Sequence, residues 1–115
     1  MRARILKRGA AAVTAAILLG ALAASPGSAG DPAAGRKRAV ACQTCHGIDG
    51  VSKMPDAPNL SGQVEGYLVK ALTDFRSGAR SNETMSLVAK DLSDADIANL
   101  AAHYARIQVE ITPPD

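Results

Sequence analysis

Cys42-Gln43-Thr44-Cys45-His46 is the stretch that decides how this chain is interpreted. Two cysteines separated by two residues, with histidine directly after the second, form the pattern of c-type haem attachment. Two thiols on one helical turn can each add to a vinyl group of the same haem, and the imidazole of His46 then lies where it can bind the iron. The chain has no other cysteine and one further histidine. The motif therefore predicts one covalently attached haem with His46 as an axial ligand.

Three other interpretations of this motif are weaker. A disulfide between Cys42 and Cys45 would close a very short, strained loop and would leave His46 without a role. A thioredoxin-like redox pair requires a βαβ context, and no strand pattern surrounds the motif. A structural zinc site requires four ligands, and only His103 could complete the set. Haem attachment explains all three motif residues and remains the prediction.

Residues 1–29 have the pattern of a secretory signal peptide. Four basic residues precede an almost wholly apolar run over 10–24, and the small residues of 25–29 favour cleavage after Ala29. The apolar run is shorter than the ~20 residues that a spanning helix needs, which favours cleavage over a retained anchor. Bacterial c-type haem is attached after the chain has crossed the inner membrane. Both segments therefore predict a periplasmic protein, with no stable membrane insertion after cleavage.

Residues 30–115 are predicted to form one small, mildly acidic domain. Four of the 13 basic residues lie in the signal segment, which leaves nine against 11 acidic residues and a net charge of −2. This charge does not suggest nucleic acid binding, and it predicts weak, salt-sensitive contacts with protein partners. The sequence contains no Trp, one Phe and two Tyr. Because so small a core is thin, we expect the haem to complete it.

The pattern along this domain predicts an all-α fold, with three to five helices and loops wrapped around the haem. The first helix is expected to start at Asp31-Pro32, to run through Gly35 and Ala41, and to deliver the cysteines. Residues 47–62 contain the prolines and glycines of turns and loop. Apolar residues at helical spacing predict a second helix over 64–75, ended by Ser77-Gly78-Ala79.

The last third of the chain predicts two further helices. Residues 85–89 could begin a short helix. Ser93-Asp94-Ala95-Asp96 has the form of a capped helix start with acidic residues in the first turn. The apolar stripe of this last helix comprises Ile97, Leu100, Ala101, Tyr104 and Ile107.

The second axial ligand must come from a distant part of the chain, and Met85 is the leading candidate. A thioether is a soft ligand that suits low-spin haem iron, and His/Met ligation raises the reduction potential. Met1 is removed with the signal, and Met54 lies in a proline-rich loop soon after the motif. Met54 and His103 stay open as alternatives.

The chain resembles the small bacterial class I c-type cytochromes, both the short single-haem forms and either half of the related di-haem forms. The resemblance covers Asp31 to Ile107. It rests on Cys42-X-X-Cys45-His46-Gly47, Pro58-Asn59-Leu60-Ser61-Gly62-Gln63, Tyr67-Leu68, Phe75-Arg76-Ser77-Gly78-Ala79-Arg80, Met85 and the segment 92–101.

This resemblance implies a role for each matched residue. Cys42 and Cys45 carry the thioethers, His46 is the proximal ligand and Met85 the distal ligand. Pro58 matches the proline whose carbonyl accepts a hydrogen bond from the His46 ring. Gly35 matches the small residue where the first helix crosses the last, and Tyr67 and Arg80 match positions near the haem edge and propionates.

One position departs from the family pattern. The family usually has an aromatic residue three positions after the last-helix leucine, where this chain has His103. We expect His103 to replace that aromatic in packing, with its polar edge at the surface.

The resulting prediction is a periplasmic single-electron carrier that is not an enzyme, acts on redox protein partners and exists as a monomer or a subunit. The main alternative is a dedicated electron-accepting subunit of a periplasmic dehydrogenase, for example one that oxidises sulfide. A peroxidase or a haem-based sensor would need an open or labile iron site, which a Met85 ligand argues against.

Overall fold

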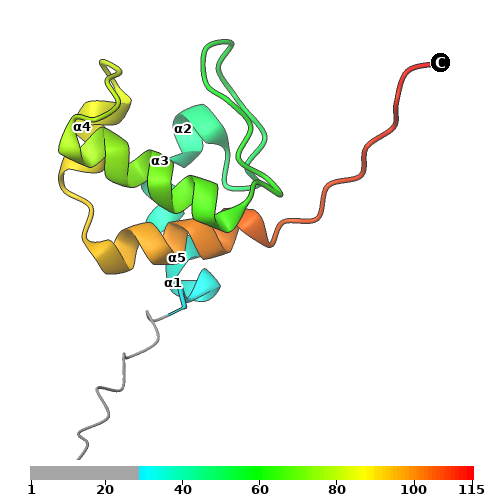
Figure 1. The fold of residues 1–115 in the computed structure, drawn as a ribbon. Helices are drawn as coiled ribbons and strands as arrows, with labels where there is room; N and C mark the ends of the chain where they lie inside the picture. The colour runs from blue at the N-terminus through cyan, green and yellow to red at the C-terminus, as the bar shows by residue number, and fades with distance from the viewer. Residues whose placement is uncertain (1–28) are drawn as a thin grey trace, which may run out of the picture.

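The computed structural model describes residues 29–115, and in this range the chain is all-helical, as predicted (Figure 1). The predicted signal peptide falls on residues outside this range, apart from Ala29. No helix in 29–115 is both long enough and apolar enough to cross a membrane. The elements are α1 (Pro32–Arg38), η1 (Ala39–Ala41), α2 (Gln43–His46), α3 (Glu65–Ser77), α4 (Met85–Lys90) and α5 (Asp94–Ala105).

Helix α1 crosses α5 at very close range. Asp31 caps α1 by accepting a hydrogen bond of 2.8 Å from the backbone N–H of Ala33, and Pro32 occupies the first helical position. A Cβ on Gly35 would lie only 1.9 Å from the carbonyl oxygen of Asn99. Only glycine therefore allows the two backbones to approach this closely, as the family resemblance implied.

The first helix is shorter than predicted. A continuous helix through Ala41 was expected, but α1 ends at Arg38 and passes into the 3₁₀ turn η1. The prediction was wrong because helical propensity does not distinguish an α-helix from a 3₁₀ turn. Here the N–H of Cys42 donates to the carbonyl of Ala39, an i→i+3 hydrogen bond of the 3₁₀ type. The turn redirects the chain into the separate short helix α2, which contains Cys45 and His46.

Helices α3 and α5 enclose the core, and α5 lies between α3 and α1 (Figure 1). The predicted α3 is confirmed, and Gly78 ends it with a φ of 83°, a left-handed conformation that suits glycine. The predicted cap of α5 is also confirmed. Ser93 and Asp96 form a reciprocal capping box.

The buried core is small. It comprises Ala39, Leu68, Phe75, Ala89, Leu92, Ile97, Leu100, Ala101 and Tyr104. Four of the five predicted stripe residues of the last helix are among them. Ile107 is the exception, because α5 ends at Ala105 and Ile107 follows it as a partly buried loop residue. The chain then continues as an extended tail away from the helices (Figure 1).

Candidate cofactor site

A cavity of about 520 Å³ lies between α2, α3, α4, α5 and the loop 54–63. It brings together all seven predicted site residues, which are Cys42, Cys45, His46, Pro58, Tyr67, Arg80 and Met85. Its walls include apolar side chains from two helices, among them Leu68 and Leu72 of α3 and Leu100 of α5. Segments that are far apart in the sequence thus converge on one largely apolar space.

The two cysteines lie at the α2 end of the cavity. Cys42 precedes the helix as its N-cap residue and Cys45 lies within it, so both thiols leave the same turn. Both are free and half-buried. Burial raises the pKa of the Cys42 thiol, while Arg38 lowers it and Cys45 adds a smaller increase. Thiols placed in this way can both reach one bound group.

His46 is buried and held in one orientation. Its Nδ1 lies 2.8 Å from the carbonyl oxygen of Pro58. A carbonyl can only accept, so Nδ1 carries the proton and Nε2 keeps a free lone pair for a metal. This is the hydrogen bond that the family resemblance implied for Pro58. The arrangement is typical of histidine ligands, whose second nitrogen is usually fixed by a carbonyl or carboxylate.

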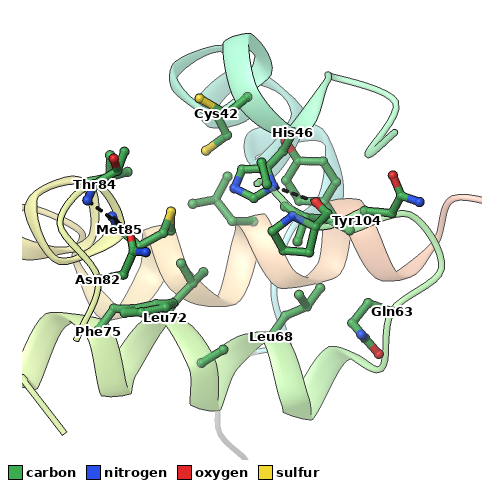
Figure 2. A pocket seen from close by; sticks show the side chains of 18 of the residues that line it. Cys42, His46, Gln63, Leu68, Leu72, Phe75, Asn82, Thr84, Met85 and Tyr104 are labelled. Atoms are coloured by element: carbon green, nitrogen blue, oxygen red, sulfur yellow. Dashed lines mark hydrogen bonds between the residues drawn. The ribbon is translucent and has the colours of Figure 1, made fainter. Parts of the chain in front are cut away.

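Met85 lies across the cavity from His46, with Leu68 and Leu72 along the side between them (Figure 2). It is the first residue of α4, and Asn82 fixes this start. The Asn82 side-chain oxygen accepts hydrogen bonds from the backbone N–H groups of Thr84 at 3.0 Å and Met85 at 2.9 Å. Asn82 was missed in the sequence because it does not stand directly before the helix, where Thr84 is the N-cap residue and where a start signal is normally sought.

The two alternative ligands differ from Met85 in position. Met54 also lines the cavity, but its side chain is 43% exposed in the loop. His103 does not line the cavity at all. It is 8% exposed, and its Nε2 lies 3.0 Å from the carbonyl oxygen of Ile48. The expectation that its polar edge lies at the surface was wrong, because a carbonyl 55 residues earlier in the chain satisfies that edge inside the fold.

Tyr67 and Arg80 lie at the rim of the cavity. Tyr67 is 49% exposed, and Arg80 is exposed with its guanidinium carbon 4.5 Å from the centre of the Phe75 ring. This stacking is a cation–π contact. Their proximity to a haem edge or propionate remains a prediction.

Tyr104 is a site residue that the sequence assigned only to packing. Its side chain is 3% exposed, lines the cavity, and donates a hydrogen bond of 3.1 Å to the carbonyl of Gly47, directly after His46. Burial is the main cause that raises the pKa of Tyr104 far above its usual range, with smaller contributions from Cys42 and Asp49. The hydroxyl is therefore a permanent donor.

The donor set fits one large planar, mainly apolar group. Two thiols and one imidazole lie at one end, a thioether lies opposite, and apolar side chains line the space between. Nitrogen and thioether donors suit haem iron. A family model described as Cytochrome c matches residues 32–105.

The chain belongs to the cytochrome c family. Its cofactor is therefore covalent haem c with iron, as predicted from the sequence. This cytochrome is 42% identical over 80 residues to cytochrome c-554(548) of Halomonas halodenitrificans, a match that covers 67% of this chain and 96% of the relative. The class of small c-type cytochromes predicted from the motifs is confirmed.

Similarity also extends to longer cytochromes. Cytochrome c4 of Pseudomonas aeruginosa is 41% identical over 88 residues, covering 76% of this chain and 44% of the relative. A protein named thiosulfate dehydrogenase electron acceptor, from Stutzerimonas stutzeri, is 48% identical over 65 residues, covering 56% of this chain and 30% of the relative. This cytochrome thus spans less than half the length of these two proteins.

The fold agrees with a solved cytochrome. The crystal structure of reduced recombinant cytochrome c4 from Pseudomonas stutzeri superimposes with a TM-score of 0.68 at 34% identity. The match covers 76% of this chain and 50% of that chain. The predicted cytochrome c-like fold is confirmed.

Proposed function

We propose that this cytochrome is a periplasmic single-electron carrier, and not an enzyme, in which Cys42 and Cys45 bind the haem and His46 and Met85 are the axial ligands. One observation carries the proposal. His46 and Met85 lie on opposite sides of an apolar cavity that both cysteines also line (Figure 2). When bound, the haem supplies a reversible one-electron change at its iron.

Side chains of the protein set the reduction potential of the bound haem. The Nδ1–H of His46 donates to Pro58, which orients the ring and makes Nε2 a stronger ligand. Met85 supplies a thioether, which raises the reduction potential. Leu68, Leu72 and Leu100 line the cavity and limit access of water, which also affects the potential.

With His46 and Met85 both holding the iron, no position would remain for oxygen, peroxide or a substrate, which would favour an electron carrier over an enzyme. Tyr67 and Arg80 lie at the exposed rim, where a redox partner can approach. We expect contacts with such partners to be small and short-lived, as for other electron-transfer encounters.

The axial ligands are tested by the visible spectrum of the reduced holoprotein with and without carbon monoxide. We expect no change in the wild type and prompt binding in Met85→Ala, together with a lower reduction potential because the thioether is lost. Met54→Ala is the matched control and should stay closed. Carbon monoxide binding by Met54→Ala, with a closed Met85→Ala, would move the ligand to Met54.

The periplasmic location rests on the export pattern of residues 1–29, followed by a cytochrome domain over 30–115. The intact mass of protein from a periplasmic extract tests this. The expected species begins at Gly30 and includes one haem. A cytoplasmic species that retains residues 1–29 would contradict the proposal.

A second candidate function is a dedicated electron acceptor of a periplasmic dehydrogenase. Its support is the relative from Stutzerimonas stutzeri, whose name states such a role for thiosulfate dehydrogenase. Affinity isolation of the tagged holoprotein from periplasm distinguishes the two functions. A larger subunit that remains bound in stoichiometric amount favours the dedicated acceptor, and a cytochrome recovered alone favours the diffusing carrier.

A further inference from the structure

Two consecutive residues of α5 hold the two residues that directly follow His46. The Tyr104 hydroxyl donates to the carbonyl of Gly47 at 3.1 Å, and His103 Nε2 lies 3.0 Å from the carbonyl oxygen of Ile48. Since a carbonyl only accepts, Nε2 of His103 must carry a proton. These bonds join segments 57 and 55 residues apart.

The turn that these bonds hold is sterically demanding. Gly47 has a φ of 72°, and a Cβ there would lie 2.2 Å from the Asp49 carboxylate and 2.6 Å from the carbonyl of Val51. Gly50 closes the turn by donating from its N–H to the carbonyl of Gly47 at 3.3 Å. The backbone direction immediately after His46 is therefore set by this turn and by what anchors it.

His103 occupies a place where a phenylalanine side chain would pack but could not hold the turn after His46 by a hydrogen bond. A Cβ on Gly35 would lie only 2.9 Å from the Cβ of His103, so His103 lies at the crossing of α1 and α5. The imidazole is 8% exposed and tilts against the Tyr104 ring, with centroids 4.8 Å apart. A phenyl ring could fill this volume, but only a donor can bond to the Ile48 carbonyl.

We propose that His103 is a positioning residue for His46, acting with Tyr104 through the turn 47–50. The Pro58 carbonyl fixes the His46 ring, and the two α5 donors fix the backbone carbonyls of Gly47 and Ile48, the two residues that follow His46. The role needs no contact between His103 and the haem, in agreement with its absence from the cavity wall. The inference rests on the proposed role of His46 as an iron ligand.

The test compares His103→Phe, which fills the space without a donor, with His103→Gln, which restores an N–H donor. In His103→Phe, amide hydrogen exchange at Gly50 should rise about fivefold, the factor that corresponds to a lost bond of about 1 kcal/mol. The electron paramagnetic resonance g-values of the ferric holoprotein should also shift, because they report the orientation of the axial imidazole. His103→Gln should return both readouts toward the wild type.

Asn99→Ala is the matched control. It removes the 2.7 Å bond from the Asp31 N–H to Asn99, which also links α1 to α5 but does not contact the turn. We expect this variant to lower stability and to leave exchange at Gly50 and the g-values unchanged. Equal changes in Asn99→Ala and His103→Phe would reduce His103 to a general packing role and overturn the proposal.

Tyr104→Phe keeps the inference testable if His103→Phe does not fold, since it removes a single oxygen atom. Wild-type exchange at Gly50 and wild-type g-values in whichever of these two variants folds would overturn the proposal. Failure of the proposed function is recognised separately. A wild-type protein that binds carbon monoxide promptly contradicts the closed His/Met site, whereas exchange at Gly50 still reports whether His103 anchors the turn.

Discussion

The His46 side of the cavity is held by hydrogen bonds from distant segments, whereas the bonds that fix the start of the Met85 helix come from its own loop. Pro58, His103 and Tyr104 all bond to His46 or to the turn after it. On the other side, Asn82 bonds to Thr84 and Met85, within three residues. We therefore expect the Met85 side to open by local unfolding, whereas a change on the His46 side should lower the stability of the whole fold.

The most disruptive change removes both attachment points, in Cys42→Ala with Cys45→Ala. We expect loss of covalent haem and of cooperative thermal unfolding, because the small core would lack the group that fills its cavity. Haem staining after denaturing electrophoresis and a circular dichroism melt measure the two effects. Normal covalent loading in this double variant would refute the central assignment.

Gly47→Ala should disturb the turn after His46 and thereby lower the stability of the whole fold. A side chain at a φ of 72° costs about 1–3 kcal/mol, and its Cβ would also collide with the Asp49 carboxylate and the Val51 carbonyl. Denaturant unfolding measures the loss. Gly66→Ala is a suitable control, since a Cβ there meets nothing within 4 Å and the position is helical. Equal stability of the two variants would contradict the prediction.

Asn82→Ala should weaken the Met85 side by about 1 kcal/mol, the usual cost of losing a side-chain cap at a helix start. Because the opening is local, carbon monoxide should bind the reduced protein faster than in the wild type, with the His46 side intact. Asn82→Asp keeps the acceptor oxygen and should restore slow binding. If Asn82→Ala lowers global stability without changing carbon monoxide binding, the two sides are not independent.

Substitution of Asp96, which belongs to neither the His46 side nor the Met85 side, should change stability least. A hydrogen bond from the Ser93 backbone, with Arg38 nearby, holds the pKa of Asp96 below its usual range. A lowered folded-state pKa contributes stability above the usual carboxyl range, and this contribution is lost as pH falls through the folded pKa. Asp96→Asn should cost about 0.5 kcal/mol at neutral pH and less in acid. A cost that does not fall in acid would contradict this.

The sequence predicts much of this site because the chemistry is local in two places. The cysteine spacing and His46 are neighbours along the chain, and the cap of α5 depends on Ser93 and Asp96 alone. Elimination among the methionines made Met85 the leading ligand, and the family resemblance supported it. The resemblance alone supplied Pro58 and Gly35, because no local pattern encodes which distant residues these two contact. The break at η1 escaped prediction because alanine and valine continue a helix as readily as they enter a tight turn.

The polar interior of the fold was the least predictable part. The roles of His103 and Tyr104 depend on carbonyl groups more than 50 residues earlier in the chain. A backbone carbonyl has no sequence signature, since every residue carries one. The apolar stripe of α5 therefore predicted which residues are buried, but not which of them also form hydrogen bonds.

The close crossing of α1 and α5 has a consequence for the order of folding. The Asp31 N–H reaches an Asn99 oxygen 68 residues away, so this contact cannot form until nearly the entire chain is present. Contacts of such long sequence separation close slowly. We therefore expect the cysteine motif to be accessible during synthesis, before the last helix can pack against the first.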